Sequence, residues 1–516
     1  MIAAVAPTQD RLTQVRIDAS AVGLAMILVV TTALRLSLFR HAPLGFDETW
    51  TGDIASQPDL PHFLHQAVAD VNGPLAYLIA WLWAPVSGLS DAALRVPSEV
   101  FTCLAPILPL VFGRELSRTT RLVWSALLAC WAPDVVFAEL ARCYSLLIFL
   151  GVAEALAFIR LIRRPSLGAA MAWCAMSALF ILAHYAALPL VAIQGCAFIA
   201  VHRVSALKTW PAALVFVPVF GFIALQARIL AAFSTPGHAW IAPLNLPTLP
   251  ILMAYLLGSF PILIGAAIWG AVGIVKASGK PAEPGGWRLD RGEILLAITG
   301  LAAVGLVVVL GFLRPMVTPR YLTPEVPAIL FGVTLASRYF ARGARIMPAL
   351  VVALAFGYNL GMVVRPPFAM GDGSFEKASA DLMASGVRRV DFFWDSPLTQ
   401  GDDKVQFASV GGFFFRRAGY KAEVRVPAWS PDLDPNALLA GRASRPGDGF
   451  IWIYDNGVAA VRAVAHPPRV WRLNPALRCE RYMSGAIHVL ACVVPHPRAG
   501  RAPAPRLRPL TPASPR

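Results

Sequence analysis

Residues 293–313 read EILLAITGLAAVGLVVVLGFL, and after Glu293 this run contains no charged side chain. A helix needs roughly 20 mostly apolar residues to cross a hydrocarbon core of about 30 Å. The run reaches that length. We therefore expect a membrane-spanning helix here.

The rest of the chain extends this pattern. Of its 516 residues 57% are hydrophobic and 15% are charged, and the mean hydropathy is +0.60. Soluble globular chains are nearer a quarter charged, so the composition argues against a water-soluble fold. Runs of spanning length predict a polytopic α-helical membrane protein with about eleven transmembrane helices, near residues 19–39, 96–113, 122–138, 143–159, 167–186, 188–201, 210–228, 246–275, 293–313, 322–337 and 346–364.

Basic residues set the predicted orientation, because Lys and Arg gather in cytoplasmic loops. Successive basic clusters are separated by two spans each, so one orientation places all of them in the cytoplasm. They are Arg11 and Arg16; Arg114, Arg118 and Arg121; Arg160, Arg163 and Arg164; Arg203 and Lys208; Lys276, Lys280, Arg288 and Arg291; and Arg338, Arg342 and Arg345. Residues 1–18 are then cytoplasmic, and the loop at 40–95 is extracytoplasmic.

The segment 74–90 (PLAYLIAWLWAPVSGLS) is apolar enough to count as a further span. Counting it would move the cluster at residues 114–121 to the outside. We therefore expect an amphipathic or re-entrant helix at the membrane interface, a position that suits its tyrosine and tryptophans.

The predicted membrane domain covers residues 19–365, with a retained first span because no small-residue cleavage site follows it. Residues 366–494 mix charged, aromatic and β-branched residues and predict a small extracytoplasmic α/β domain, and the Pro/Arg-rich stretch 495–516 predicts a disordered tail. Strand-like runs lie at 387–395, 422–428, 449–455 and 486–494. Cys479 and Cys492 can pair there if the compartment is oxidising.

The net charge of +15 raises the question of nucleic acid. No basic helix interleaved with aromatics is present, so we expect no nucleic-acid partner. Anionic lipid head groups are the expected partner of these charges.

Asp47 and Glu48 follow the first span in GFDETW. A carboxylate beside the membrane surface can take a proton from a hydroxyl, a step worth about 10²- to 10⁴-fold in rate when the geometry is right. Alternatively the pair is solvated surface.

Glu139 and Arg142 share one helical turn at the predicted outer end of the third span. They form either a local ion pair or a site in which Glu139 joins Asp47 and Arg142 binds an anion.

His184 and Tyr185 lie at the outer end of the fifth span, and Arg320 and Tyr321 lie before the tenth. His184 is either a hydrogen-bonded structural residue or part of a site. Arg320 either snorkels to the interface or binds a phosphate, for which a guanidinium is well shaped. All these candidates fall on the outer side in an orientation set only by the basic clusters, which favours a shared site.

The order of these segments resembles the GT-C superfamily of glycosyltransferases, in the branch of bacterial dolichyl-phosphate-mannose-protein mannosyltransferase-like and aminoarabinose-transferase-like proteins. The resemblance covers about residues 17–365 and rests on the Asp-Glu loop, DVNGPLAYLIAWLW (70–83), DAALRVPSEV (91–100), AELARCYSLL (138–147), AHYAAL (183–188) and PRYLTPEVPAIL (319–330).

The resemblance implies an inverting transferase in the bacterial inner membrane, which moves a sugar from a polyprenyl-phosphate carrier to an envelope lipid, glycan or protein on the outer face. It implies that Asp47 is the base, with Glu48 beside it and Glu139 as a second acid. Arg142 and Arg320 would bind the donor phosphate. The residues that would support the pocket are His184, Tyr185, Tyr321 and Asn72.

Two motifs depart from the family. Relatives commonly carry His-Pro-Pro where this chain has Asn72-Gly73-Pro74, and Gln-Glu-Ala-Arg where it has Glu139-Leu140-Ala141-Arg142. Metal use varies within the superfamily, and no His/Asp cluster with ligand spacing is present. No cofactor is therefore predicted, and a divalent metal is left open without support from ligand spacing.

Two other classes of function remain open. Glu99, Asp134 and Glu154 lie in predicted spans, where acidic residues often mark a transport path. A secondary transporter is therefore one alternative, although the spans show no inverted repeat. A non-catalytic membrane scaffold that presents the soluble domain is the other.

Overall fold

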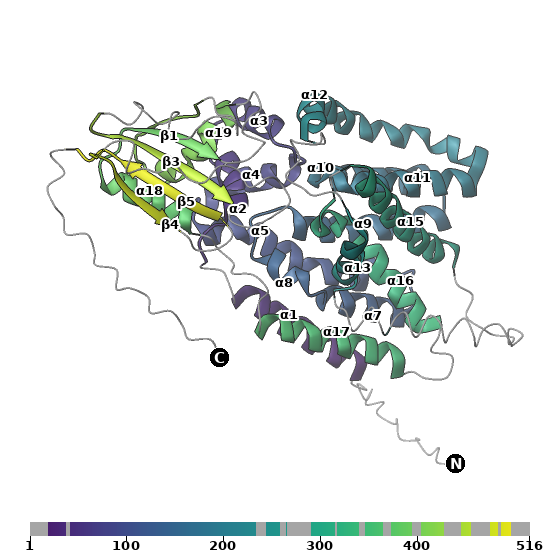
Figure 1. Cartoon of the computed structure of the whole chain (residues 1–516). Helices are drawn as coiled ribbons and strands as arrows, with labels where there is room; N and C mark the ends of the chain where they lie inside the picture. The colour runs from purple at the N-terminus through teal and green to yellow at the C-terminus, as the bar shows by residue number, and fades with distance from the viewer. Residues whose placement is uncertain are drawn as a thin grey trace, which may run out of the picture.

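The structure is a computed structural model that describes residues 19–37, 42–233, 244–258, 265, 290–314, 317–339, 346–364, 373–394, 404–427, 445–455, 475–482 and 487–496. It consists of a long helical part and a C-terminal part built on one sheet (Figure 1). The predicted cytoplasmic end at 1–18, the tail beyond residue 496, and Lys276, Lys280 and Arg288 lie outside the described residues.

The helical part is a multi-pass membrane structure. Within the described ranges, four helical stretches are long and apolar enough to cross a bilayer, namely Asp91–Phe112, Tyr144–Arg163, Tyr185–Ala231 and Arg291–Leu313, and five shorter helices are also apolar. The first half consists of α1 (Ala19–Ser37), α2 (Phe46–Ala55), α3 (Leu60–Ala69), α4 (Leu75–Ser87), α5 (Asp91–Leu104), η1 (Ala105–Ile107), α6 (Leu108–Phe112), α7 (Arg118–Ala129), α8 (Pro133–Ala138), α9 (Tyr144–Arg163) and α10 (Leu167–Ala183). The second half consists of η2 (Tyr185–Ala187), α11 (Leu188–His202), η3 (Arg203–Phe216), α12 (Val217–Phe233), η4 (Leu246–Thr248), α13 (Leu249–Leu257), α15 (Arg291–Leu313), η5 (Pro319–Glu325), α16 (Val326–Tyr339) and α17 (Ile346–Val364).

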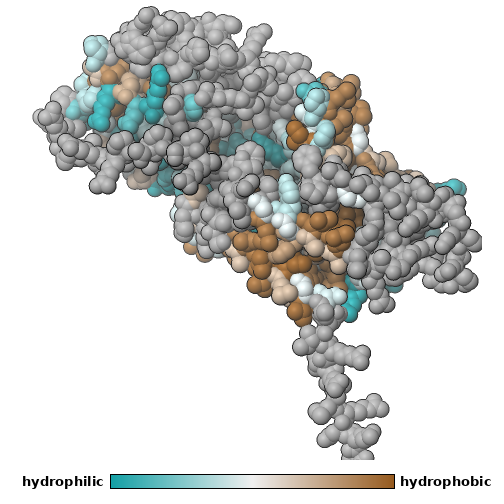
Figure 2. Space-filling view, turned by 60° about the horizontal axis from the view of Figure 1, so that its bottom comes forward, coloured by the Kyte–Doolittle hydropathy of each residue, from teal (hydrophilic) through white to brown (hydrophobic). Residues whose placement is uncertain are grey.

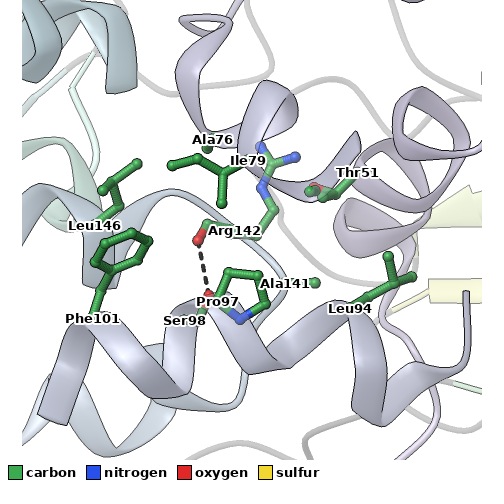
Figure 3. A pocket seen from close by; sticks show the side chains of 11 residues that line it. Thr51, Ala76, Ile79, Leu94, Pro97, Ser98, Phe101, Ala141, Arg142 and Leu146 are labelled. Carbon is green, nitrogen blue, oxygen red and sulfur yellow. Dashed lines mark hydrogen bonds between the residues drawn. The ribbon is translucent and has the colours of Figure 1, made fainter. Parts of the chain in front are cut away.

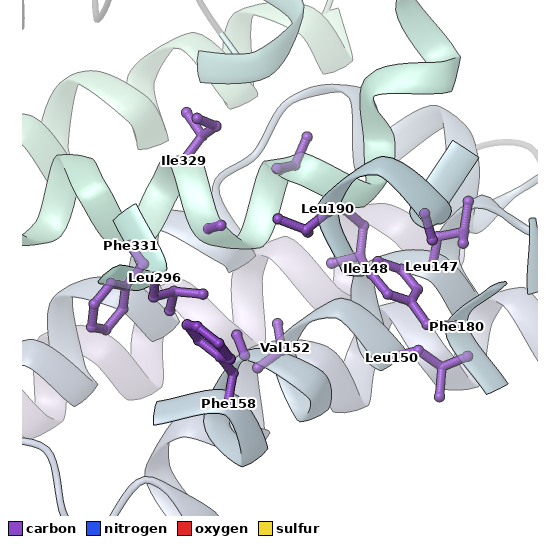
Figure 4. Close-up of a cluster of buried hydrophobic side chains, with 14 of the residues drawn as sticks. Leu147, Ile148, Leu150, Val152, Phe158, Phe180, Leu190, Leu296, Ile329 and Phe331 are labelled. Carbon is purple, nitrogen blue, oxygen red and sulfur yellow. The ribbon is translucent and has the colours of Figure 1, made fainter. Parts of the chain in front are cut away.

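Helix α9 is the centre of the helical core. It packs against α5, α10, α15 and α16, and Figure 4 shows its Phe158 among side chains of these neighbours, including Phe180 and Phe331. A Cβ atom on Gly300 would lie 2.7 Å from the Cβ of Ala328, so this glycine allows the close approach of α15 to α16.

The outward faces of the helices are apolar as well. Val29, Leu225 and Leu301 are each about two-thirds exposed, at 67%, 67% and 64%. Figure 2 shows hydrophobic residues gathered over the helical part. Such contiguous apolar surface suits lipid and not water.

One predicted span is interrupted in the structure, and one segment that was not counted as a span is a short helix. The span expected at 122–138 is divided into α7 and α8 by residues 130–132, because Pro133 has no backbone N–H with which to continue the helical hydrogen bonds. The segment 74–90 forms α4, whose 13 residues extend about 20 Å at 1.5 Å each, short of the membrane core.

The C-terminal part is a two-layer α/β unit. Its strands are β1 (Arg389–Trp394), β2 (Glu423–Arg425), β3 (Asp448–Asp455), β4 (Arg478–Tyr482) and β5 (Ile487–Val493), in the order β2-β1-β3-β5-β4. Strand β1 pairs in parallel with β2 and β3, whereas β5 pairs antiparallel with β3 and β4. The helices α18 (Ser374–Ala384), α19 (Lys404–Gly411) and α20 (Phe413–Arg417) belong to this part, and α18 and α20 share a core with one face of the sheet.

Strand β4 was not predicted from the sequence. It is an edge strand with the polar sequence RCERY, and it has no apolar alternation to reveal it. Cys479 in β4 lies opposite Cys492 in β5, and the two form a disulfide.

The sheet unit is packed onto α2. A single apolar core includes Phe46 of α2 together with Phe375 and Phe392 of the C-terminal part. A Cβ atom on Gly52 would lie 2.5 Å from the ring of Phe413, so α20 sits directly against the α2 backbone. Arg416 of α20 also pairs with the buried carboxylate of Asp53. Helix α2 is therefore held by the C-terminal part along its length.

Candidate functional site

Asp47 occupies the first turn of α2. Gly45 is the N-cap of this helix, and the backbone N–H of Gly45 donates to Glu48 Oε2 at 2.7 Å. A carboxylate in the first turn is stabilised by the positive end of the helix dipole. The cap thus fixes both the start of α2 and the position of Asp47.

The Asp47 carboxylate pairs with an arginine from a distant stretch of chain. Arg320, in η5, donates from Nη1 to Asp47 Oδ2 at 2.9 Å. The side chains of Arg320 and Asp47 are 30% and 55% exposed, so the pair is open to solvent. The structure therefore brings together two predicted residues that are 273 positions apart.

Arg142 reaches the same place from the turn before α9. Its Nη1 donates to the backbone carbonyl of Asp47 at 3.1 Å and to the Tyr77 hydroxyl at 3.3 Å. Its Nε makes no hydrogen bond within the described part of the chain. Two guanidinium groups therefore lie beside one carboxylate, and one of them keeps an unused donor.

These charges set the ionisation of Asp47. Desolvation raises the pKa of its carboxyl, but the positive charges of Arg320 and Arg142 outweigh that effect and hold the pKa below its ordinary value. Asp47 is consequently a carboxylate at neutral pH.

Glu48 points to the other side of α2. Its side chain and that of Arg95 are 1% and 2% exposed, and Arg95 Nη2 donates to Glu48 Oε2 at 2.9 Å. Glu48 Oε1 accepts from Arg95 Nε at 3.0 Å and from the Ala141 backbone N–H at 2.8 Å. Glu48 thus joins α2, α5 and the turn that carries Arg142.

Glu139, the residue after α8, is completely buried. The negative charge of Glu139 interacts electrostatically with the Arg95 guanidinium. The structure therefore associates Glu139 with the Glu48–Arg95 pair behind α2, and not with the exposed face of Asp47.

Asn72 is connected to the site through Tyr77. Its Nδ2 donates to Asp70 Oδ1 at 2.7 Å and to the Tyr77 hydroxyl at 3.3 Å. Because that hydroxyl also accepts from Arg142, Asn72 contributes to holding Arg142 in place.

His184 and Tyr321 lie next to each other, with ring centroids 5.0 Å apart, and Tyr321 also packs against the Arg320 guanidinium. His184 Nδ1 accepts from the Ala186 backbone N–H at 3.1 Å, which leaves the proton of a neutral ring on Nε2. Nε2 is buried and has no hydrogen-bond partner among the described residues. His184 therefore offers one N–H donor close to both arginines.

The Tyr185 side chain points toward α12 and not toward Asp47. Its hydroxyl donates to Gln226 of α12. The Gln226 amide in turn donates to the carbonyls of Ala67 and Asp70, at 2.9 and 2.5 Å. Tyr185 thus supports the connection between α3 and α4 that leads to Asn72.

A groove begins at Arg142. It is shallow and open to solvent, with a cavity volume of about 20 Å³, and it is lined mainly by apolar side chains of α4, α5 and the start of α9, including Ile79, Pro97, Phe101 and Leu146. Figure 3 shows the Arg142 guanidinium at its edge beside Ile79. An apolar surface therefore adjoins the Arg142 guanidinium.

Sequence reasoning missed two residues of this site. Tyr77 was assigned to the membrane interface, although its hydroxyl lies between Arg142 and Asn72. Arg95 lies in the quoted stretch 91–100 but received no role. An arginine surrounded by apolar residues on a predicted helix was the available signal, since such a charge needs a partner. Among the described residues, no group of three or more His, Cys, Asp or Glu side chains could hold a metal ion.

The structure is similar to two crystal structures of ArnT from Cupriavidus metallidurans, one bound to undecaprenyl phosphate and one in the apo state. The TM-score is 0.53 for both, the sequence identities are 13% and 15%, and the match covers 92% of this chain and 97% and 98% of ArnT. ArnT is a GT-C superfamily protein. The likeness confirms the predicted GT-C fold, a polytopic helical membrane part with a small C-terminal sheet.

No protein-family profile matches the chain, and no curated protein sequence matches it significantly.

Proposed function

We propose that this protein is a membrane glycosyltransferase that moves a sugar from a polyprenyl-phosphate donor to an envelope acceptor, with inversion at the anomeric carbon. The observation that carries the proposal is the meeting of Asp47, Arg142 and Arg320 from three distant stretches of chain, and Arg142 also lines the apolar groove.

The donor is assigned to the groove and the two arginines. The first isoprene units would lie against the apolar lining, and the phosphate would lie at Arg142 and Arg320. Guanidinium groups bind phosphate through paired hydrogen bonds. The Nε2–H of His184 is a further donor beside them. The fold of ArnT, which was crystallised with undecaprenyl phosphate, supports this donor class.

Asp47 is assigned as the base. The acceptor oxygen forms a bond to the anomeric carbon, the bond from that carbon to the phosphate oxygen breaks, and the phosphate leaves with the electron pair. Asp47 takes the proton of the acceptor hydroxyl. The arginines stabilise the negative charge that develops on the leaving phosphate.

The Asp47–Arg320 pair suggests an order of events. A phosphate at Arg320 competes with the Asp47 carboxylate for the same guanidinium. Once Arg320 binds the donor, Asp47 loses its partner and becomes a stronger base. Donor binding would then prepare the base for the acceptor.

Glu48, Glu139, Asn72 and Tyr185 are assigned supporting roles. Glu48 holds the first turn of α2 through Arg95, and Glu139 acts on the same arginine. Asn72 and Tyr185 hold the segment that contacts Arg142 and Gln226. Their replacement should alter geometry more than chemistry.

We place the site at the extracytoplasmic surface of a bacterial inner membrane, with the amino terminus in the cytoplasm and the C-terminal unit as the extracytoplasmic domain. The distribution of basic clusters along the sequence supports this orientation.

The transporter alternative rests on acidic residues within the helical part. Asp134 pairs with Arg35 at 3.1 Å. Glu154 accepts from Trp173 at 2.6 Å, in a separate cluster with Gln194. These two acids have different partners on different helices, which favours structural roles over a shared transport path.

The proposal is tested by mass spectrometry of envelope glycolipids and glycans from a deletion strain complemented with variants. The deletion should remove a product heavier by one sugar, the unmodified gene should restore it, and Asp47→Asn should not. Asp59→Asn is the matched control, because the Asp59 side chain is 51% exposed and also paired, with His62. If Asp47→Asn restores the product as well as Asp59→Asn does, Asp47 is not the base.

A further inference from the structure

The carboxyl end of the C-terminal sheet lies against the helix that carries Asp47. Strand β1 has parallel neighbours on both sides, and the chain passes from one side of it, at β2, to the other, at β3. In α/β sheets, ligands bind outside the carboxyl ends of the strands where the order reverses in this way. Figure 1 shows β1 and β3 directed toward the helical part.

An aromatic cluster occupies this end of the sheet. Trp394, the last residue of β1, has its ring centroid 5.1 Å from that of Phe46 and 6.0 Å from that of Trp50, both on α2. Phe407 of α19 lies 5.5 Å from Trp50 and 5.9 Å from Trp394. The cluster therefore combines the sheet, α19 and α2.

Two members of the cluster are buried and two are partly exposed. Phe46 and Phe407 are buried, at 4% and 6% exposure. Trp50 and Trp394 remain partly exposed. The indole N–H of Trp50 makes no hydrogen bond to any part of the chain that the structure describes. The exposed parts of both indole rings and the Trp50 N–H are therefore accessible to a ligand.

The partly exposed Trp50 adjoins the site. Trp50 follows Asp47 by three residues on α2, so the two side chains lie on the same helix face, with Cβ atoms about 5–6 Å apart. A ligand on the tryptophans would therefore place a group within reach of the Asp47 carboxylate.

We propose that Trp50 and Trp394 bind a saccharide, and that this saccharide supplies the acceptor hydroxyl. The C–H faces of sugar rings stack on indole rings, and the Trp50 N–H is placed to donate to a ring hydroxyl. The inference rests on the proposed function, and it narrows the acceptor from any envelope lipid, glycan or protein to a carbohydrate.

Saturation-transfer difference NMR on the full chain in lipid nanodiscs tests the proposal, with cellobiose, chitobiose and lactose as probes. The unmodified protein should transfer saturation to at least one of them. Trp50→Ala and Trp394→Ala should each weaken binding by about twofold to twelvefold, since an aromatic contact contributes about 0.5–1.5 kcal/mol. Trp210→Ala is the control, because Trp210 is 63% exposed and lies in η3, outside the cluster.

Trp50→Phe provides a second variant if Trp50→Ala does not fold. It keeps an aromatic face and should retain most of the binding. Asp47→Asn should bind saccharide as the unmodified protein does, so loss of transfer with retained binding separates the base from the acceptor site. The proposal is overturned if no probe binds. It is equally overturned if Trp50→Ala and Trp394→Ala leave saccharide binding unchanged. If both variants then also impair membrane insertion equally, the tryptophans are interface anchors.

Discussion

Replacing Arg95 with Met should destabilise the protein far more than the same replacement of Arg320. Arg95 is paired with Glu48 through two hydrogen bonds, of 3.0 and 2.9 Å, in a site where both side chains are at most 2% exposed. Removing one partner of a buried pair leaves an uncompensated charge and costs about 3–5 kcal/mol. The Asp47–Arg320 pair is 55% and 30% exposed, and such pairs contribute about 0–1 kcal/mol.

The free energy of unfolding can be measured for both variants by titrating SDS into detergent micelles and following circular dichroism. Arg95→Met should lose about 3–5 kcal/mol and Arg320→Met no more than about 1 kcal/mol. Arg320→Met should nevertheless lose transfer activity. The double variant Glu48→Gln with Arg95→Met should lose less than the sum of the single variants, because the two residues share one interaction. Equal losses from Arg95→Met and Arg320→Met would refute the division into a supporting pair and a functional pair.

Three further predictions follow from the site. Asp47→Asn should lower the rate of transfer by about 10²- to 10⁴-fold with little change in stability, and in the unmodified protein the acid limb of kcat/KM should lie below about pH 4, because neighbouring arginines hold the Asp47 pKa below its ordinary value. Arg142→Met should raise the apparent KM for the polyprenyl-phosphate donor in a transfer assay, and an unchanged KM would exclude Arg142 from phosphate binding. Burial raises the pKa of Asp53 to about 6 despite its contact with Arg416, so the folded protein keeps a proton that the unfolded chain releases near pH 4. The unfolding free energy should therefore fall as pH rises from about 4 to about 6, and a pH titration of Asp53→Asn should show a smaller fall.

The sequence was sufficient to predict the fold class and to find the two oppositely charged residues of the site, Asp47 and Arg320. Asp47 and Arg320 were both placed on the outer side from the spacing of basic clusters, and the structure brings them to 2.9 Å. Their separation of 273 residues shows why such reasoning must rely on sidedness, since no local pattern connects them.

The sequence could not show that the adjacent residues Asp47 and Glu48 have different roles. Asp47 and Glu48 are neighbours on one helix, and successive helical side chains point in directions about 100° apart. One is therefore exposed beside Arg320 while the other is buried against Arg95. Knowing which of the two lies beside Arg320 requires the packing of α2 between α5 and the sheet, and only the tertiary structure provides that.

Chemical labelling of Asp47→Cys and Arg320→Cys, in a background where the exposed Cys196 is replaced by Ser, tests the central claim most directly. A membrane-impermeant maleimide should label each introduced thiol from the extracytoplasmic side of intact cells. In the double variant, a short bis-maleimide should join residues 47 and 320 within one chain. Labelling of the two positions from opposite sides of the membrane, or the absence of that cross-link, would contradict a common site.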